Sequence, residues 1–100
     1  MLLKVKSIQT GKIVIEQAFP ADVQLITIGR SPDCDVVISD SRISRRHLKI
    51  QKIGEAYFIE DTNSTNHTYI NGKLINSNVK TKLSSGDKVR LANEDFTFSV

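Results

Sequence analysis

The chain has 100 residues, of which 39% are hydrophobic and 25% are charged, as in an ordinary folded domain. No apolar run reaches the roughly 20 residues that cross a membrane, and the one cysteine, Cys34, cannot form a disulfide within the chain. The net charge of +3 is too small to indicate a nucleic-acid-binding protein by itself. We therefore expect a single domain over residues 1–100, in a cytoplasmic or otherwise intracellular compartment and without a membrane partner.

Short segments in which apolar and polar residues alternate recur along the chain, and no helical periodicity accompanies them. Alternation is typical of half-buried strands, because successive side chains of a strand point to opposite faces of the sheet. In chain order the alternating sets are Leu3/Val5, Ile13/Ile15, Leu48/Ile50, Val79/Thr81/Leu83, Val89/Leu91 and Phe96/Phe98/Val100. Turn residues such as Gly11, Gly54 and Gly86 separate them at short intervals. The pattern predicts an all-β sandwich or barrel.

The strongest local hairpin signal is the pair Asn71 and Gly72, which separates the segments "TYI" and "KLI". Both residue types accept the positive φ that a type I′ turn demands. We therefore expect a two-residue hairpin here. Asn71 and Gly72 are assigned a structural role in supporting the site, with no contact to a ligand.

Arginine and lysine are segregated along the sequence. Four of the five arginines lie between residues 30 and 47, whereas all lysines lie outside this window; the four are Arg30, Arg42, Arg45 and Arg46. Arginine suits bidentate recognition of carboxylate or phosphate, so its segregation favours one anion-binding locus. The same window holds three aspartates that are alternative ion-pair partners, namely Asp33, Asp35 and Asp40. Charge alone therefore leaves an anion site and a set of internal ion pairs both open.

Two polar stretches, residues 29–46 and 61–68, interrupt the alternation, and we take them as the candidate site because loops gather at the ends of a sandwich. Four segments in this order resemble the forkhead-associated (FHA) domain family: "GRSPDCDVVI", "SRRHLKI", "FIEDTNSTNHTYING" and "LSSGDKVRL". The resemblance covers residues from about 25 to 100. It implies a β-sandwich of about eleven strands whose loops at one end bind phosphothreonine peptides, with no catalysis, cofactor or metal.

The resemblance also implies roles for five binding residues. Arg30 matches the arginine of the family's Gly-Arg element, which reaches the phosphate. Ser44 and Arg45 match the start of the Ser-Arg-x-His element, which cradles the phosphate oxygens. Thr65 and Asn66 match the Ser-Thr-Asn element, in which the threonine contacts the phosphate and the asparagine binds the peptide backbone. Arginine and hydroxyl groups are natural partners for the charge and the acceptor oxygens of a phosphothreonine.

Other residues of these segments receive accessory or structural assignments. Arg42 is positioned for an accessory contact to the phosphate or to a downstream side chain. Gly29 is expected to free the backbone to turn ahead of Arg30. The resemblance implies that His47 holds the phosphate-binding loop by hydrogen bonding. Nothing selects Arg46 over a solvated surface arginine, and Cys34 is interpreted as a small packed residue.

The second loop departs from the family pattern Gly-Ser-Thr-Asn-Gly-Thr, because Asn63 and His67 replace its two glycines. Asparagine and histidine are among the residues enriched at positive φ, so both are compatible with the same loop shape. An altered loop would instead displace Asn66 and put the affinity for the peptide, or its dependence on phosphate, in doubt.

We therefore predict a phosphothreonine-peptide recognition module that mediates phosphorylation-dependent protein-protein interaction and is monomeric as an isolated domain. Ser44 and His47 have neither an orienting acid nor an oxyanion site that would make a hydrolase, so no enzyme is expected. Two alternatives remain: a phosphate-independent interaction module on the same fold, and a nucleic-acid-binding domain. The second is disfavoured, because the aromatic residues lie mostly at strand positions and form no base-stacking platform.

Overall fold

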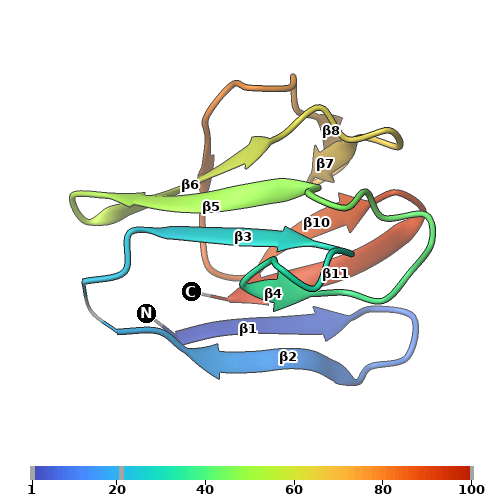
Figure 1. The fold of residues 1–100 in the computed structure, drawn as a ribbon, viewed down its shortest axis with the longest axis horizontal. Coiled ribbons are helices and arrows are strands. Elements are labelled where there is room, and N and C mark those ends of the chain that lie inside the picture. Colours follow the sequence, from blue (N-terminus) through green and yellow to red (C-terminus); the bar gives the residue numbers. More distant parts are fainter. Residues whose placement is uncertain (1, 21, 100) are drawn as a thin grey trace.

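A computed structural model describes residues 2–20 and 22–99, and within these ranges the chain forms eleven β-strands (Figure 1). The strands are β1 (Leu2–Ser7), β2 (Ile13–Ala18), β3 (Leu25–Gly29), β4 (Val36–Val37), β5 (Leu48–Ile53), β6 (Ala56–Asp61), β7 (Thr68–Ile70), β8 (Lys73–Leu74), β9 (Thr81–Leu83), β10 (Asp87–Leu91) and β11 (Glu94–Ser99). Within the same ranges there is no helix long and apolar enough to cross a membrane.

The strands form two sheets that pack face to face. One sheet has six strands in the order β2-β1-β11-β10-β7-β8, and the other has five in the order β4-β3-β5-β6-β9. All pairings are antiparallel except that of β3 with β4. The predicted sandwich of about eleven strands is confirmed.

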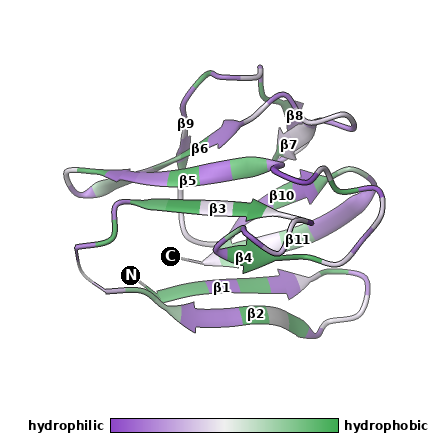
Figure 2. Cartoon of the chain, viewed as in Figure 1, coloured by the Kyte–Doolittle hydropathy of each residue, from purple (hydrophilic) through white to green (hydrophobic). Residues whose placement is uncertain are grey.

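The hydrophobic core lies between the sheets and is built by the alternation visible in the sequence. Hydrophobic and hydrophilic residues alternate along strands such as β1 and β5 in Figure 2. Leu3 and Val5 of β1 and Ile50 of β5 are fully buried, and Phe96 and Phe98 of β11 contribute the largest buried side chains. Burial of an aliphatic side chain stabilises the fold by about 1.5–3 kcal/mol, so this alternation supplies much of the driving force.

One of the predicted strand positions differs from expectation. Val79 does not belong to a strand: β9 begins at Thr81, and the Val79 side chain is 51% exposed. The alternation that includes Val79 was therefore misleading, since the segment before β9 runs over the surface. Val100 lies outside the described residues.

The hairpin at Asn71 and Gly72 is confirmed. Ile70 of β7 pairs with Lys73 of β8, which leaves two residues in the turn, and their φ angles are 49° and 84°. The Asn71 side chain also fixes the neighbouring β10, because its Oδ1 accepts the backbone N–H of Lys88 at 3.0 Å. This turn is therefore anchored to the sheet.

Strand register brings the two polar stretches to one end of the sandwich. Ile28 of β3 pairs with Leu48 of β5, and Leu48 also pairs with Asp61 of β6. β3 therefore ends where β5 begins and where β6 ends. Residues 30–47 and 62–67 follow from these points, and the connection from β4 to β5 runs along the right-hand side of the molecule in Figure 1.

Candidate functional site

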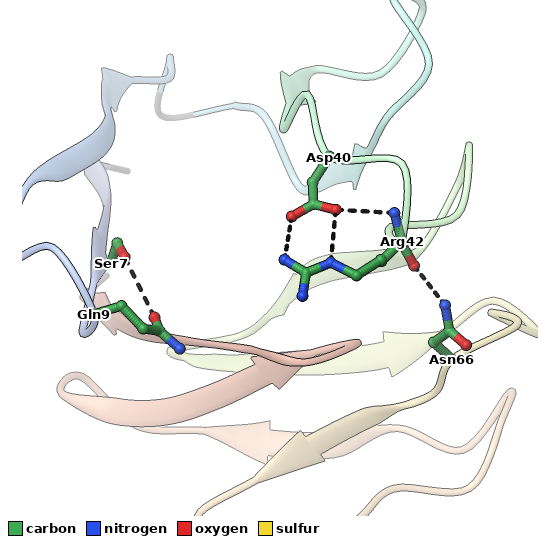
Figure 3. Close-up of polar contacts among 5 residues, drawn as sticks. All are labelled: Ser7, Gln9, Asp40, Arg42 and Asn66. Carbon is green, nitrogen blue, oxygen red and sulfur yellow. Dashed lines mark hydrogen bonds and ion pairs between the residues drawn. The ribbon is translucent and has the colours of Figure 1, made fainter.

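The two polar loops contact each other through short hydrogen bonds. The backbone N–H of Thr65 donates to Oγ of Ser44 at 2.9 Å. One loop residue further, Nδ2 of Asn66 donates to the carbonyl oxygen of Arg42 at 2.8 Å (Figure 3). Residues that are more than twenty positions apart in the sequence therefore form one surface, as the sequence predicts for the candidate site.

Arg30 lies against the first of these loops. Its backbone N–H donates to the carbonyl oxygen of Ser44 at 3.0 Å, and its side-chain Nε donates to the carbonyl oxygen of Ile43 at 3.1 Å. Arg30 is exposed, and its guanidinium carries five N–H donors, of which one donates to Ile43. Arg30, Ser44 and Thr65 consequently surround one small region of the loop end.

The backbone of Arg45 packs tightly on the end of β3. A Cβ built on Gly29 would lie 2.1 Å from the carbonyl oxygen of Arg45, far closer than any real Cβ contact. That oxygen also accepts the backbone N–H of Ser31 at 3.0 Å and Sγ of Cys34 at 3.2 Å. Gly29 does not have a positive φ, so its expected role as a turn residue is wrong: the glycine permits a close approach of two backbone segments.

Cys34 is a packed residue and not a reactive one. Its side chain is 8% exposed, and burial together with the neighbouring Asp33 carboxylate raises the pKa of the thiol. A thiol in such a site is mostly protonated near neutral pH and is a poor nucleophile.

His47 joins the two loops from inside. The ring is fully buried; its Nδ1 accepts the backbone N–H of Ser44 at 3.1 Å, and its Nε2 lies 2.9 Å from the carbonyl oxygen of His67. Because Nδ1 is an acceptor, we assign the proton to Nε2, which donates to His67. Burial lowers the pKa of His47 below 6.5, although the His67 carbonyl opposes the shift. The neutral ring thus holds both loops in place.

Asp61 organises the second loop, a role that the sequence analysis missed. The carboxylate lies at the end of β6, is 1% exposed, and accepts hydrogen bonds from the backbone and Oγ of Ser64, from Oγ1 of Thr68 at 2.7 Å and from Oγ of Ser77 at 2.9 Å. Burial raises the pKa of Asp61, but these hydrogen bonds outweigh burial and hold the pKa below its ordinary value. The detectable signal was an aspartate three residues before a serine, which is typical of a local side chain-to-backbone turn.

In the second loop, Asn63 and His67 stand where the family pattern has glycine, and both residues have a positive φ. Asn63 and His67 have φ angles of 61° and 65°, in the left-handed region that glycine occupies most easily. Thr65 and Asn66 lie between them and remain directed at the first loop.

Two arginines of the window form ion pairs. Arg46 lies 2.8 Å from Asp33, and both side chains are more than half exposed. Arg42 lies 2.8 Å from Asp40 in a bidentate arrangement.

Arg30 and Arg45 form no ion pair with any carboxylate in the described ranges. The remaining aspartate of the window, Asp35, accepts hydrogen bonds from the backbone and hydroxyl of Thr27 instead. Internal ion pairs therefore account for Arg42 and Arg46 and not for Arg30 and Arg45, for which an anion site stays a prediction. No cluster of His, Cys, Asp and Glu side chains suited to a metal ion occurs among the described residues.

Comparison with known proteins gives concordant matches. The FHA domain family model matches residues 26–92. The oxoglutarate dehydrogenase inhibitor of Corynebacterium jeikeium is 37% identical over 73 residues, which are 73% of this chain and 49% of the relative. The glycogen accumulation regulator GarA of Mycolicibacterium smegmatis is 34% identical over 73 residues, which are 73% of this chain and 44% of GarA. The chain thus spans about half the length of these curated relatives.

Among solved structures, the N-terminal FHA domain of S. cerevisiae Rad53p, in complex with a phosphothreonine peptide, has a TM-score of 0.80 and is 25% identical. The match covers 100% of this chain and 94% of that one.

Proposed function

We propose that this chain, which belongs to the FHA domain family, is a phosphothreonine-peptide recognition module that mediates phosphorylation-dependent protein-protein interaction. The similarity to a yeast FHA domain in complex with a phosphothreonine peptide supports this proposal. The module binds and does not catalyse, its partner is a protein that carries a phosphothreonine, and residues 1–100 act as one domain.

The observation that carries the proposal is the hydrogen bond between Ser44 and Thr65 beside Arg30, whose guanidinium pairs with no carboxylate of the described residues. A phosphothreonine brings close to two negative charges and three acceptor oxygens. The guanidinium N–H groups of Arg30 and the hydroxyl of Ser44 are donors of the kind that form short, charge-assisted hydrogen bonds with phosphate oxygens. Since Oγ of Ser44 accepts from Thr65, its own hydrogen is free to donate to the phosphate.

The neighbouring residues complete the proposed site. Arg45 and the hydroxyl of Thr65 add contacts to the phosphate. Asn66 uses one N–H to hold the carbonyl oxygen of Arg42, which leaves the second N–H and the side-chain oxygen for the peptide backbone. His47 and Gly29 act behind the site, because one links the loops and the other permits their close packing.

The test is a binding series with matched phosphothreonine, phosphoserine and unphosphorylated peptides, selected from an oriented phosphothreonine library and measured by calorimetry. We expect binding to the phosphothreonine peptide, none to the unphosphorylated one, and roughly 10- to 200-fold weaker binding to phosphoserine, because a buried methyl group contributes about 1–3 kcal/mol. Binding of a protein bait that survives phosphatase treatment would support the phosphate-independent alternative. Strong retention on DNA at physiological salt would support the nucleic-acid alternative.

A further inference from the structure

Arg42 is held by an internal carboxylate at the edge of the proposed site. Its Nε and Nη2 lie 3.1 and 2.8 Å from the two carboxylate oxygens of Asp40, and its backbone N–H donates to the same carboxylate at 2.9 Å (Figure 3). The side chain of Asp40 is 19% exposed, compared with 47% for that of Arg42. The hydrogen bonds from Arg42 lower the pKa of Asp40 to about 2, so Asp40 is charged under all physiological conditions.

Arg42 lies where side chains that flank the phosphothreonine would pass. Its carbonyl oxygen accepts Nδ2 of Asn66, and it precedes Ser44 by two residues. An unpaired arginine at this place would attract an acidic side chain of the peptide through bidentate hydrogen bonds. Here, however, the Nε/Nη2 edge of the guanidinium already forms a bidentate pair with Asp40.

The surroundings of Arg42 are acidic. Asp40 and Glu94 both line a surface hollow of about 480 Å³, with Ser7, Thr10 and Phe96 among its other walls, and none of the described residues that line it is basic. Asp40, and after it Glu94, raise the pKa of Arg42, as expected for nearby negative charges. One cation and two carboxylates give this corner a net charge of −1.

We propose that Asp40 is a specificity-determining residue. It occupies the Nε/Nη2 edge of the Arg42 guanidinium and makes the site select against phosphopeptides with an acidic side chain at the position that reaches this corner. This preference rests on the proposed function. A peptide carboxylate would have to displace Asp40 from the Nε/Nη2 edge or add a third carboxylate beside Asp40 and Glu94. Such like-charge contacts are a general means of rejecting wrong partners. The preferred ligands are phosphothreonine peptides with a neutral or basic side chain there.

The experiment uses alanine-background phosphothreonine peptides in which each of the three positions on either side of the phosphothreonine in turn carries Asp, Ala or Lys. Dissociation constants are measured for the intact chain and for Asp40→Asn. The Asn side-chain oxygen can still accept the backbone N–H of Arg42, so the turn is preserved while the charge is removed. At one position we expect Asp to weaken binding to the unmodified chain, and the Asp-to-Ala ratio of dissociation constants to fall about tenfold in Asp40→Asn, the scale of one charge-assisted hydrogen bond.

The matched control is Asp33→Asn, which removes the carboxylate of the other arginine pair in the same window. It should leave every Asp-to-Ala ratio unchanged. Combining Asp40→Asn with Arg42→Gln should return the ratio to that of Arg42→Gln alone, because the effect of Asp40 acts through Arg42.

The outcomes separate this preference from the proposed function. The role of Asp40 is overturned if the Asp-to-Ala ratio at all six positions is the same in Asp40→Asn as in the unmodified chain. It is also overturned if the ratio shifts equally in Asp33→Asn. Either result leaves phosphothreonine recognition intact. If the unmodified chain binds no phosphothreonine peptide more tightly than its unphosphorylated counterpart, the proposed function fails and the preference fails with it.

Discussion

Gly29 faces the carbonyl oxygen of Arg45 so closely that a methyl group cannot fit without a shift of backbone. We expect Gly29→Ala to lower the free energy of unfolding by about 1–3 kcal/mol, the usual cost of overpacking. Because the displaced segment carries Ser44 and contacts Arg30, phosphopeptide binding should weaken as well. Urea denaturation and calorimetry measure the two effects.

The control for this variant is Gly54→Ala. Gly54 has a φ of 61° with open space around it, and it lies in the β5–β6 turn at the opposite end of the sandwich. It should lose some stability through backbone strain and bind the phosphopeptide normally. Unchanged stability and binding in Gly29→Ala would show that the close approach is not required.

Arg30 and Ser44 are the two side chains on which the proposed phosphate contact depends most. We expect Arg30→Ala and Ser44→Ala each to weaken phosphopeptide binding by about 1.5–3 kcal/mol, the scale of a hydrogen bond to a charged group. Arg46→Ala is the control, because Arg46 is 71% exposed and is already paired with Asp33. Calorimetry on the folded variants tests this. Near-normal affinity in Arg30→Ala or in Ser44→Ala would show that the phosphate binds elsewhere.

At the scale of elements, the β6–β7 connection depends on one buried carboxylate. Asp61→Asn replaces an acceptor oxygen by an amide that faces the donors of Ser64, Thr68 and Ser77. We expect a loss of about 1.5–3 kcal/mol in the free energy of unfolding, and weaker phosphopeptide binding because Thr65 and Asn66 belong to this loop.

Asp95→Asn is the matched control for that change, since Asp95 forms an ion pair with Arg90 on the surface. Surface pairs contribute little, so its stability should change only slightly. If thermal melting of Asp61→Asn equals that of Asp95→Asn, the Asp61 network does not stabilise the loop.

Strand assignment from the sequence succeeded where one face of a strand is buried and the other is solvated. β1, β10 and β11 follow this pattern, and their alternating residues lie in the core. β6 was not among the alternating segments, because Tyr57 packs on the core while the adjacent Phe58 faces outward and is also partly covered. An aromatic residue on each face removes the period of two.

At the scale of the whole molecule, binding and stability respond to pH through different groups. Binding should weaken as pH falls through about 6, where the phosphate loses its second charge. Burial lowers the pKa of His47 in the folded protein below its ordinary 6.5. The contribution of the neutral ring to the free energy of unfolding is therefore complete above pH 6.5 and decreases as pH falls below it. Asp61, whose pKa also is lowered, should sustain its contribution until pH falls below its ordinary 3.8.

These expectations are checked by measuring melting without peptide and affinity with peptide from pH 8 to about pH 3. Stability should be level above about pH 6.5, decline below it, and decline further as pH falls below about 3.8. An NMR titration of the His47 imidazole tests whether the first decline is due to this residue. A pKa above 6.5 for His47 would contradict that assignment.

Local patterns in the sequence were sufficient to predict the all-β sandwich, its hairpin at Asn71 and Gly72, the family and the two loops of the candidate site. They suffice because alternation and turn chemistry act between neighbouring residues, and because the family segments occur in a specific order. Only the tertiary structure decided which arginines are available and why Gly29 is a glycine. Strand register brings Asp33 to Arg46 and the Arg45 carbonyl to Gly29. Pairing and close approach depend on distances between residues far apart in the chain, which no local pattern encodes.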